Sequence, residues 1–191
     1  VIDFIILSVG EFSKRKNQMQ LLKALTLLKD IPQIKVVFAG DGELLKECRR
    51  FADKHKLSER TSFLGEIPNL NRLYRLSNLL AATSHSEGLP FNVMEAMYCG
   101  LPIIATRIKG HVDLLQENYN SLFFDDNSPE ELAQKIRTIY QNVALYNTLK
   151  NNAYLSKSYQ IENTLPIVVE RYGLPIPSVS KTAVYATPSA Y

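Results

Sequence analysis

Two glutamates, Glu87 and Glu95, stand with seven residues between them, and a turn and the start of a predicted helix fill that interval. Pro90 fits the first position of this helix, where its missing N–H costs nothing. The backbone N–H groups of the first helical turn then form an anion site beside Glu87, of the kind that holds phosphate. An anion site flanked by two carboxylates suits a phosphorylated ligand that also carries hydroxyl groups, such as a nucleotide sugar.

The residues around the two glutamates form a longer pattern, which reads SHSEGLPFNVMEAMYCGLPIIAT from position 84 to 106. This pattern resembles the donor-binding signature of retaining GT-B glycosyltransferases, in particular those of family 4. The glutamate spacing alone is common in proteins, whereas the glycine, alanine and proline positions around it make the resemblance specific. The alternative interpretation is an ordinary strand–loop–helix–strand unit with surface glutamates.

The resemblance implies a role for each candidate site residue. Glu87 is the expected catalytic residue, near the sugar hydroxyls or the phosphate end of the donor. Glu95 would accept hydrogen bonds from two ribose hydroxyls, which suits an ionised carboxylate. Backbone N–H groups after Glu87 would hold the diphosphate and stabilise the negative charge as it leaves. The expected donor-binding residues are Gly10, Lys16, Ile67, Gly88, Leu89, Phe91 and Glu95.

One departure from the resembled family lies after the first predicted strand. The family carries a Gly-Arg pair there, and its arginine and a following lysine together hold the diphosphate. Here Gly10 is followed by Glu11, a carboxylate that cannot replace a cation against phosphate. Lys16 can still supply the second cation, although a solvated lysine at a helix start is the alternative. Whether Lys14 or Arg15 replaces the missing arginine stays open.

Other polar positions carry weaker signals. Gly40-Asp41-Gly42 matches either the family's Gly-x-Gly turn or a plain strand–helix turn. The resemblance places the nucleobase against backbone groups beside Ile67. His85 is a candidate polar contact, with a packing or surface role favoured, and His55 and His111 are isolated and receive no role.

Composition restricts the class of protein. The chain has 191 residues and a net charge of +3, and its basic residues are scattered, so nucleic acid is not an expected partner. There is no Asp-x-Asp motif and no Cys-x-x-Cys pair, so neither a metal nor a cofactor is expected. Two cysteines, Cys48 and Cys99, and no apolar run of ~18 residues favour a cytoplasmic location. Peripheral contact with the inner face of the membrane is compatible with this composition.

Short apolar runs alternate with helix-length amphipathic segments, which predicts an α/β fold with a Rossmann-like, doubly wound parallel sheet and helices on both faces. The expected strands are 5–9, 34–39, 61–64, 79–83, 103–106 and 121–124. The expected helices are 17–29, 43–55, 69–77, 90–100, a short turn at 113–116, and 129–172 with interruptions. In the helix after Pro90, we expect Met94, Met97 and Tyr98 to face inward.

The predicted domain covers 1–173, and 174–191 reads as an extended or disordered tail. The chain begins at Val1, close to a strand, and we expect an N-terminal, acceptor-binding domain to be absent from it. The loops after four strands should face one crevice, because ligands bind at the carboxyl ends of strands in such sheets.

The resemblance implies transfer of a sugar from a nucleotide-diphosphate donor, UDP-linked by preference, to a glycan or lipid-linked acceptor in polysaccharide biosynthesis. The isolated chain is expected to be inactive toward acceptors. Another GT-B enzyme, such as a sugar-nucleotide epimerase or a phosphorylase, and a non-catalytic nucleotide-binding module remain as alternatives.

Overall fold

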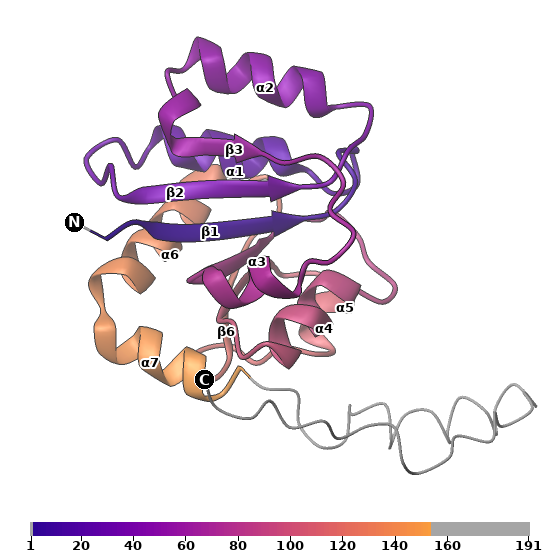
Figure 1. Cartoon of the computed structure of the whole chain (residues 1–191). Helices are drawn as coiled ribbons and strands as arrows, with labels where there is room; N and C mark the ends of the chain where they lie inside the picture. Colours follow the sequence, from indigo (N-terminus) through magenta and orange to yellow (C-terminus); the bar gives the residue numbers. More distant parts are fainter. Residues whose placement is uncertain (1, 154–191) are drawn as a thin grey trace, which may run out of the picture. The chain divides into compact units, whose positions relative to one another are not determined.

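A six-stranded parallel sheet forms the centre of residues 2–153, the part of the chain that the computed structural model describes (Figure 1). The strand order is β3-β2-β1-β4-β5-β6. The strands are β1 (Phe4–Val9), β2 (Ile34–Ala39), β3 (Thr61–Phe63), β4 (Leu79–Ala82), β5 (Ile103–Thr106) and β6 (Ser121–Phe124). The helices are α1 (Gln18–Thr26), α2 (Leu45–Lys54), α3 (Asn71–Leu76), α4 (Phe91–Tyr98), α5 (Lys109–Val112), α6 (Pro129–Gln141) and α7 (Val143–Asn151), with a 3₁₀ turn η1 (Ser58–Arg60). The predicted doubly wound α/β fold is confirmed.

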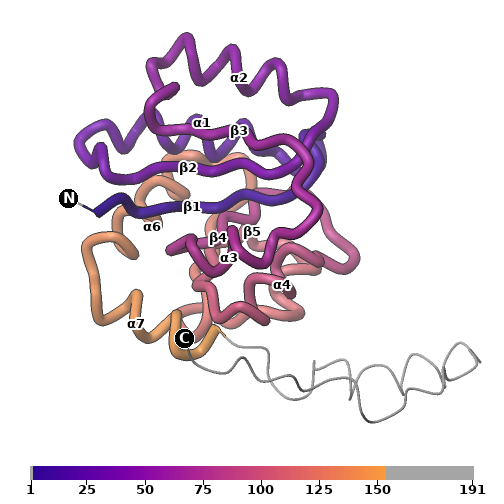
Figure 2. Tube along the Cα trace, in the orientation of Figure 1, coloured from indigo at the N-terminus to yellow at the C-terminus, as the bar shows by residue number. Residues whose placement is uncertain are grey.

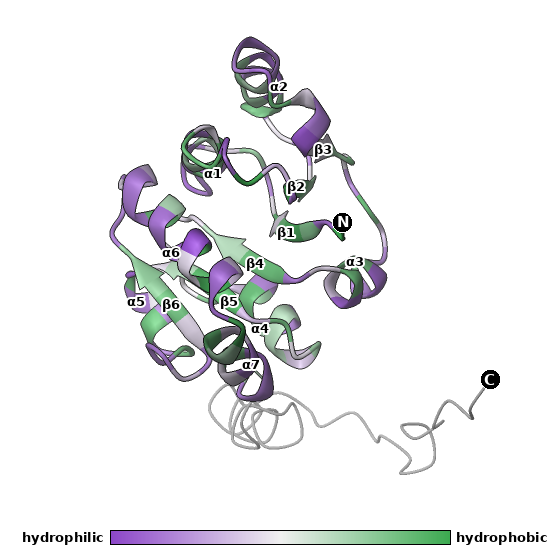
Figure 3. Ribbon diagram, turned by 90° about the vertical axis from the view of Figure 1, so that its left-hand side faces the viewer, coloured by the Kyte–Doolittle hydropathy of each residue, from purple (hydrophilic) through white to green (hydrophobic). Residues whose placement is uncertain are grey.

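The helices cover both faces of the sheet because the strands are apolar on both sides. Ile6 packs into a cluster with α1, α2 and α6, whereas its neighbour Leu7 packs into a second cluster with α3 and α4. Successive side chains of a strand point to opposite faces, so a continuous apolar run supplies two cores. Figure 3 shows the strands β4, β5 and β6 coloured mainly as hydrophobic, with α6 and α4 near them.

The chain changes direction across the sheet between β1 and β4. From β1 it builds outward through β2 and β3, and it then returns to place β4 on the other side of β1 (Figure 2). This is a topological switch point, the place at which open α/β sheets bind their ligands. The loop after β1 carries Gly10 and Lys16, and the loop after β4 carries Glu87.

Three local predictions need correction. The helical turn expected at 113–116 lies earlier: α5 begins three residues after the end of β5, and the N–H groups of His111 and Val112 donate to Ile108 O. Pro90 is the residue before α4 rather than its first residue, because its ψ of 87° is not helical. Tyr98 is 69% exposed, while Met97 is buried as expected.

The described residues do not reach the C-terminal predictions. The boundary at 173, the helical reading beyond 153 and the tail at 174–191 all lie outside them. Within residues 2–153, no helix is both long and apolar enough to cross a bilayer.

Candidate functional site

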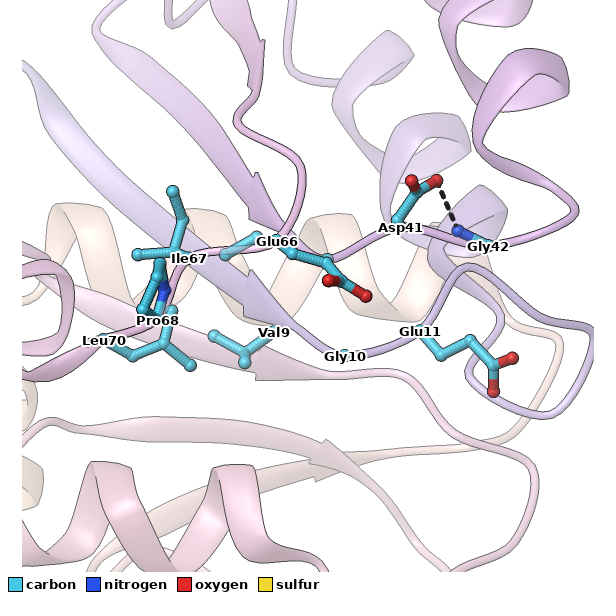
Figure 4. A pocket seen from close by; sticks show the side chains of 11 residues that line it. Val9, Gly10, Glu11, Asp41, Gly42, Glu66, Ile67, Pro68 and Leu70 are labelled. Atoms are coloured by element: carbon cyan, nitrogen blue, oxygen red, sulfur yellow. Dashed lines mark hydrogen bonds between the residues drawn. The ribbon is translucent and has the colours of Figure 1, made fainter.

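Two adjoining clefts open at the carboxyl edge of the sheet, and Val9 and Gly10 line both of them. The first, which we call the glycine cleft, has a volume of ≈ 850 Å³ (Figure 4). It is lined by Val9, Gly10, Glu11, Ala39, Gly40, Asp41, Gly42, Glu66, Ile67, Pro68 and Leu70. The second, the glutamate cleft, has a volume of ≈ 510 Å³. It is lined by Val9, Gly10, Arg15, Lys16, Glu87, Gly88, Leu89, Phe91, Asn92 and Glu95.

Glu87 lies in the glutamate cleft with its side chain only 6% exposed, and three side chains contact it. Lys16 Nζ lies 2.6 Å from Oε1, and Arg15 Nη1 lies 2.7 Å from Oε2. Ser84 Oγ donates to Oε1 at 2.7 Å. Burial alone would raise the pKa of Glu87, but the bonds from Lys16 and Ser84 and the two positive charges hold it below its ordinary value. Glu87 is therefore a carboxylate that stays ionised.

The lowered pKa of Glu87 predicts an acid-sensitive fold. Above the ordinary glutamate pKa of about 4.3, the contribution of Glu87 to stability is fully present. It is lost as the pH falls through the folded-state pKa, because the unfolded state takes up the proton first. We expect the free energy of unfolding, measured with urea from about pH 6 to about pH 3, to fall more steeply for the wild type than for Glu87→Gln. Parallel pH profiles of the free energy of unfolding would contradict the ion pairs and the hydrogen bond that surround Glu87.

Glu95 lies one helical turn inside α4 and faces the same cleft. Its Oε2 accepts a hydrogen bond of 2.7 Å from the hydroxyl of Tyr74, which is buried in α3. Burial and this bond to a carboxylate raise the pKa of Tyr74, so the phenol remains the donor. Tyr74 thereby fixes one oxygen of Glu95 and leaves Oε1 available to the cleft.

The start of α4 is fixed against the end of β1. Asn92 is buried, and its Nδ2 donates to Val9 O at 3.0 Å, while its Oδ1 accepts from Val93 N. The N–H groups of a first helical turn have no partner within the helix, so they can bind an anion. Leu89 and Phe91 line the cleft beside this turn, and both are more than half exposed.

The glycines of the site are needed for different reasons. Gly40 has a φ of +143°, and a Cβ there would lie 2.1 Å from Gly10 O; a Cβ at Gly42 would lie 2.6 Å from Phe12 O. The Gly40-Asp41-Gly42 turn is thus required by the close packing of the loops after β1 and β2. Gly88 lies outside the left-handed region, and a Cβ there would meet nothing within 4 Å. Neither the backbone nor the packing of the described residues explains Gly88.

This contrast predicts opposite results for two alanine substitutions. Gly40→Ala should lower the free energy of unfolding by about 2–4 kcal/mol, from strain and overpacking together. Gly88→Ala should change it by no more than about 0.5 kcal/mol. Urea denaturation of the two variants measures both values, and a large loss in Gly88→Ala would show that the protein itself needs this glycine.

The structure brings all of the predicted site residues into these two clefts. Ile67 lines the glycine cleft, and Gly10 lines both; the residues found in the glutamate cleft are Lys16, Glu87, Gly88, Leu89, Phe91 and Glu95. Of the two candidate replacements for the missing arginine, Arg15 lines the glutamate cleft, whereas Lys14 does not. Glu11 lines the glycine cleft, where Figure 4 shows it at the opposite end from Ile67.

Sequence reasoning missed four supporting residues. Tyr74 holds Glu95, Ser84 holds Glu87, and Asn92 holds the start of α4. His111, which received no role, is fully buried and bonded to Thr106. The only available signal was that Ser84 and Asn92 lie within the segment that carries the two glutamates. His85 pairs with Asp126 at 2.7 Å on the surface, as the favoured interpretation had it.

Within 2–153, no group of three or more histidine, cysteine, aspartate or glutamate side chains could hold a metal ion.

The six-stranded parallel sheet with helices on both faces matches the Rossmann-like fold of GT-B glycosyltransferases. Residues 2–156 match the family described as "Glycosyl transferases group 1". The chain belongs to that family.

Two curated relatives illustrate the match. The putative glycosyltransferase EpsD of Bacillus subtilis (strain 168) is 33% identical over 144 residues, which cover 75% of this chain and 38% of EpsD. A Campylobacter jejuni enzyme is 30% identical over 152 residues, covering 78% of this chain and 42% of the enzyme. Its name is GalNAc-alpha-(1->4)-GalNAc-alpha-(1->3)-diNAcBac-PP-undecaprenol alpha-1,4-N-acetyl-D-galactosaminyltransferase. The chain therefore spans less than half the length of each.

Solved structures share the fold. HepE of Anabaena in complex with UDP-glucose has a TM-score of 0.84 and 26% identity, with coverage of 90% of this chain and 49% of HepE. The C-terminal domain of LpcC, a glycosyl transferase group 1 family protein of Francisella tularensis, has a TM-score of 0.72 and 23% identity. That match covers 80% of this chain and 84% of the LpcC domain.

Proposed function

We propose that this chain is the donor-binding domain of a retaining, family 4 glycosyltransferase and binds a nucleotide-diphosphate sugar, UDP-linked. The observation that carries the proposal is the glutamate cleft, where Arg15 and Lys16 face the start of α4 and two carboxylates flank it. Cations and helix N–H groups favour a diphosphate. The carboxylates favour hydroxyl groups, and a nucleotide sugar carries both kinds of group.

Charge separates the two clefts and suggests how the donor is oriented. The glutamate cleft has both cations, whereas the charged residues of the glycine cleft are Glu11, Asp41 and Glu66. A diphosphate would be repelled from three carboxylates and attracted to two cations. We therefore assign the uncharged nucleobase to the glycine cleft beside Ile67 and the diphosphate to the glutamate cleft. Complexes of HepE with UDP and with UDP-glucose support a uridine donor.

The proposed reaction requires stabilisation of the negative charge that develops on the leaving diphosphate. Backbone N–H groups at 88–91, with Lys16 and Arg15, would stabilise that charge as the sugar departs. Glu87 would act as the catalytic residue at the sugar end, and Glu95 would bind the ribose. Gly88 would let the diphosphate approach the backbone, which gives a reason for a glycine that packing does not require. We propose that no metal ion or cofactor takes part.

The remainder of the reaction would belong to the full-length protein. Because this chain covers less than half of EpsD and of the Campylobacter enzyme, we place the acceptor, a glycan or a lipid-linked sugar, on a separate domain. The undecaprenol-linked substrate in the name of the Campylobacter enzyme supports a lipid-linked acceptor. We propose a cytoplasmic location at the inner face of the membrane.

Calorimetry on the 191-residue chain tests the proposal directly. We expect UDP and UDP-glucose to bind in the presence of EDTA, UDP more tightly than uridine, and GDP more weakly than UDP. An absolute requirement for Mg²⁺ would contradict the metal-free site. A folded chain that binds no nucleotide would overturn the proposed function. Retention is tested on the full-length protein, by NMR analysis of the anomeric configuration of its product.

A further inference from the structure

His111 is a fully buried side chain with one unsatisfied nitrogen. Its Nδ1 lies 2.9 Å from Thr106 O and 3.1 Å from Thr106 Oγ1. A carbonyl oxygen can only accept, so Nδ1 carries the proton and donates it, which leaves a lone pair on Nε2. Among the described residues, Nε2 has no hydrogen-bond partner.

An unpaired buried nitrogen needs a reason. Leaving such a group unsatisfied costs free energy, whereas an apolar side chain in the same place would avoid that cost. Burial lowers the pKa of His111, against the bond to Thr106 O and the charge of Glu87, so the ring stays neutral and gains no ion pair. The contribution of this histidine must therefore come from its Nδ1 side, where it holds Thr106.

Thr106 connects His111 to the carboxylate of the site. Thr106 is fully buried, and its Oγ1 donates to Ser84 O at 2.6 Å. Ser84 is also buried, and its own hydroxyl donates to Glu87 Oε1 at 2.7 Å. The path therefore runs from the ring of His111 through Thr106 to the backbone of Ser84, whose hydroxyl holds Glu87, so it fixes the position of the loop that carries Glu87.

The backbone beside His111 also contacts Glu87 directly. A Cβ built on Gly110 would lie 2.4 Å from Glu87 O and 2.9 Å from Glu87 Cβ. Gly110 has no left-handed φ, so it is the close approach to Glu87 that requires a glycine at this position. The short helix α5 thus supports Glu87 from two sides, through Gly110 and through the path from His111.

We propose that His111 is a positioning residue for Glu87, acting through Thr106 and Ser84. It holds the loop after β4 so that the Glu87 carboxylate meets Lys16 and Arg15 in the glutamate cleft. The expected effect of His111 on ligand binding rests on the proposed function of that cleft. The expected effect of His111 on the position and pKa of Glu87 is independent of that function.

The test compares three single variants of the 191-residue chain. His111→Leu removes the donor, whereas His111→Asn keeps a short N–H donor near the place of Nδ1. Ser121→Ala is the matched control, because Ser121 lies on β6, next to β5, and the substitution removes the bond from its buried hydroxyl to Gln116 O. The first readout is the pKa of Glu87, from the ¹³C resonance of its carboxyl carbon in an NMR titration. The second is the affinity for UDP by calorimetry.

We expect His111→Leu to raise the pKa of Glu87 toward its ordinary value and to weaken UDP binding about tenfold, the equivalent of one lost hydrogen bond. His111→Asn should keep both values near the wild type, and Ser121→Ala should change neither. In a Glu87→Gln background, His111→Leu should have no further effect on affinity, because a residue that acts through Glu87 loses its effect with it.

Several results would overturn the inference. An unchanged Glu87 pKa in folded His111→Leu is one, and an equal loss of affinity in the Glu87→Gln background is another. Should His111→Leu not fold, Thr106→Val removes the next hydroxyl of the path and must give the same rise in pKa. If the wild type binds no UDP, the proposed function fails, but the Glu87 titration still decides the positioning role.

Discussion

Lys16→Met is expected to weaken UDP binding by about thirty- to a hundredfold, which corresponds to about 2–3 kcal/mol for a lost charge-assisted hydrogen bond. The Lys16 side chain is only 14% exposed and its Nζ lies 2.6 Å from Glu87 Oε1, so solvent screens its charge little. Removing it leaves one cation, Arg15, to balance both Glu87 and a diphosphate. The affinity for uridine, which has no phosphate, should change little.

Lys14→Met is the matched control for this prediction. Lys14 lies two residues away on the same loop, is exposed and does not line the glutamate cleft. It has the same charge as Lys16, so it reports on the general attraction of the loop for anions. Calorimetry with UDP and uridine on both variants separates the two effects. Equal losses of UDP affinity in Lys14→Met and Lys16→Met would show that Lys16 does not bind the diphosphate specifically.

The fold could be predicted because its signals are local. Segments such as 34–39 and 103–106 are short apolar runs, and a sheet that is covered on both faces needs nothing else from its strands. The amphipathic spacing of 17–29 likewise predicts α1. Helix α5 escaped prediction because Lys109 and Gly110 give no apolar periodicity. Its position is set by the close contact of Gly110 with Glu87, which is a tertiary constraint.

The candidate site was only partly predictable, for a related reason. The glutamates and Gly88 are recognisable because one segment holds them together with the glycine, alanine and proline positions that make the resemblance specific. The choice of Arg15 over Lys14 depends on how the loop after β1 is held: the carbonyl of Arg15 accepts from His85 N at 2.8 Å, which ties this loop to the one after β4. Such backbone contacts leave no trace in residue identity.

The support behind the carboxylates was hidden for the same reason. His111 bonds to a backbone carbonyl, and Tyr74 reaches Glu95 from a different helix. In sequence, neither belongs to a recognisable motif: Tyr74 stands among leucine and arginine residues, and His111 stands between Gly110 and Val112. Only the fold brings them within hydrogen-bond distance of Thr106 and Glu95.

Glu95→Gln is expected to weaken UDP binding about ten- to a hundredfold, because a charged hydrogen bond is worth about 1.5–3 kcal/mol. The amide oxygen can still accept from Tyr74, so the packing of α3 against α4 should persist. The amide nitrogen, however, would present a donor to the ribose hydroxyls in place of the free carboxylate oxygen. The variant should therefore remain folded, with a free energy of unfolding close to that of the wild type.

A modified ligand localises this effect to the ribose. The wild type should bind 2′-deoxy-UDP more weakly than UDP, since one hydroxyl that donates to Glu95 is missing. Glu95→Gln should discriminate less between the two ligands, and this loss of discrimination is the coupling between Glu95 and the 2′-hydroxyl. Tyr74→Phe provides a graded control, because it removes the bond that fixes Oε2 while the carboxylate stays. A folded Glu95→Gln variant with wild-type affinity for UDP, or with undiminished discrimination against 2′-deoxy-UDP, would show that Glu95 does not bind the ribose.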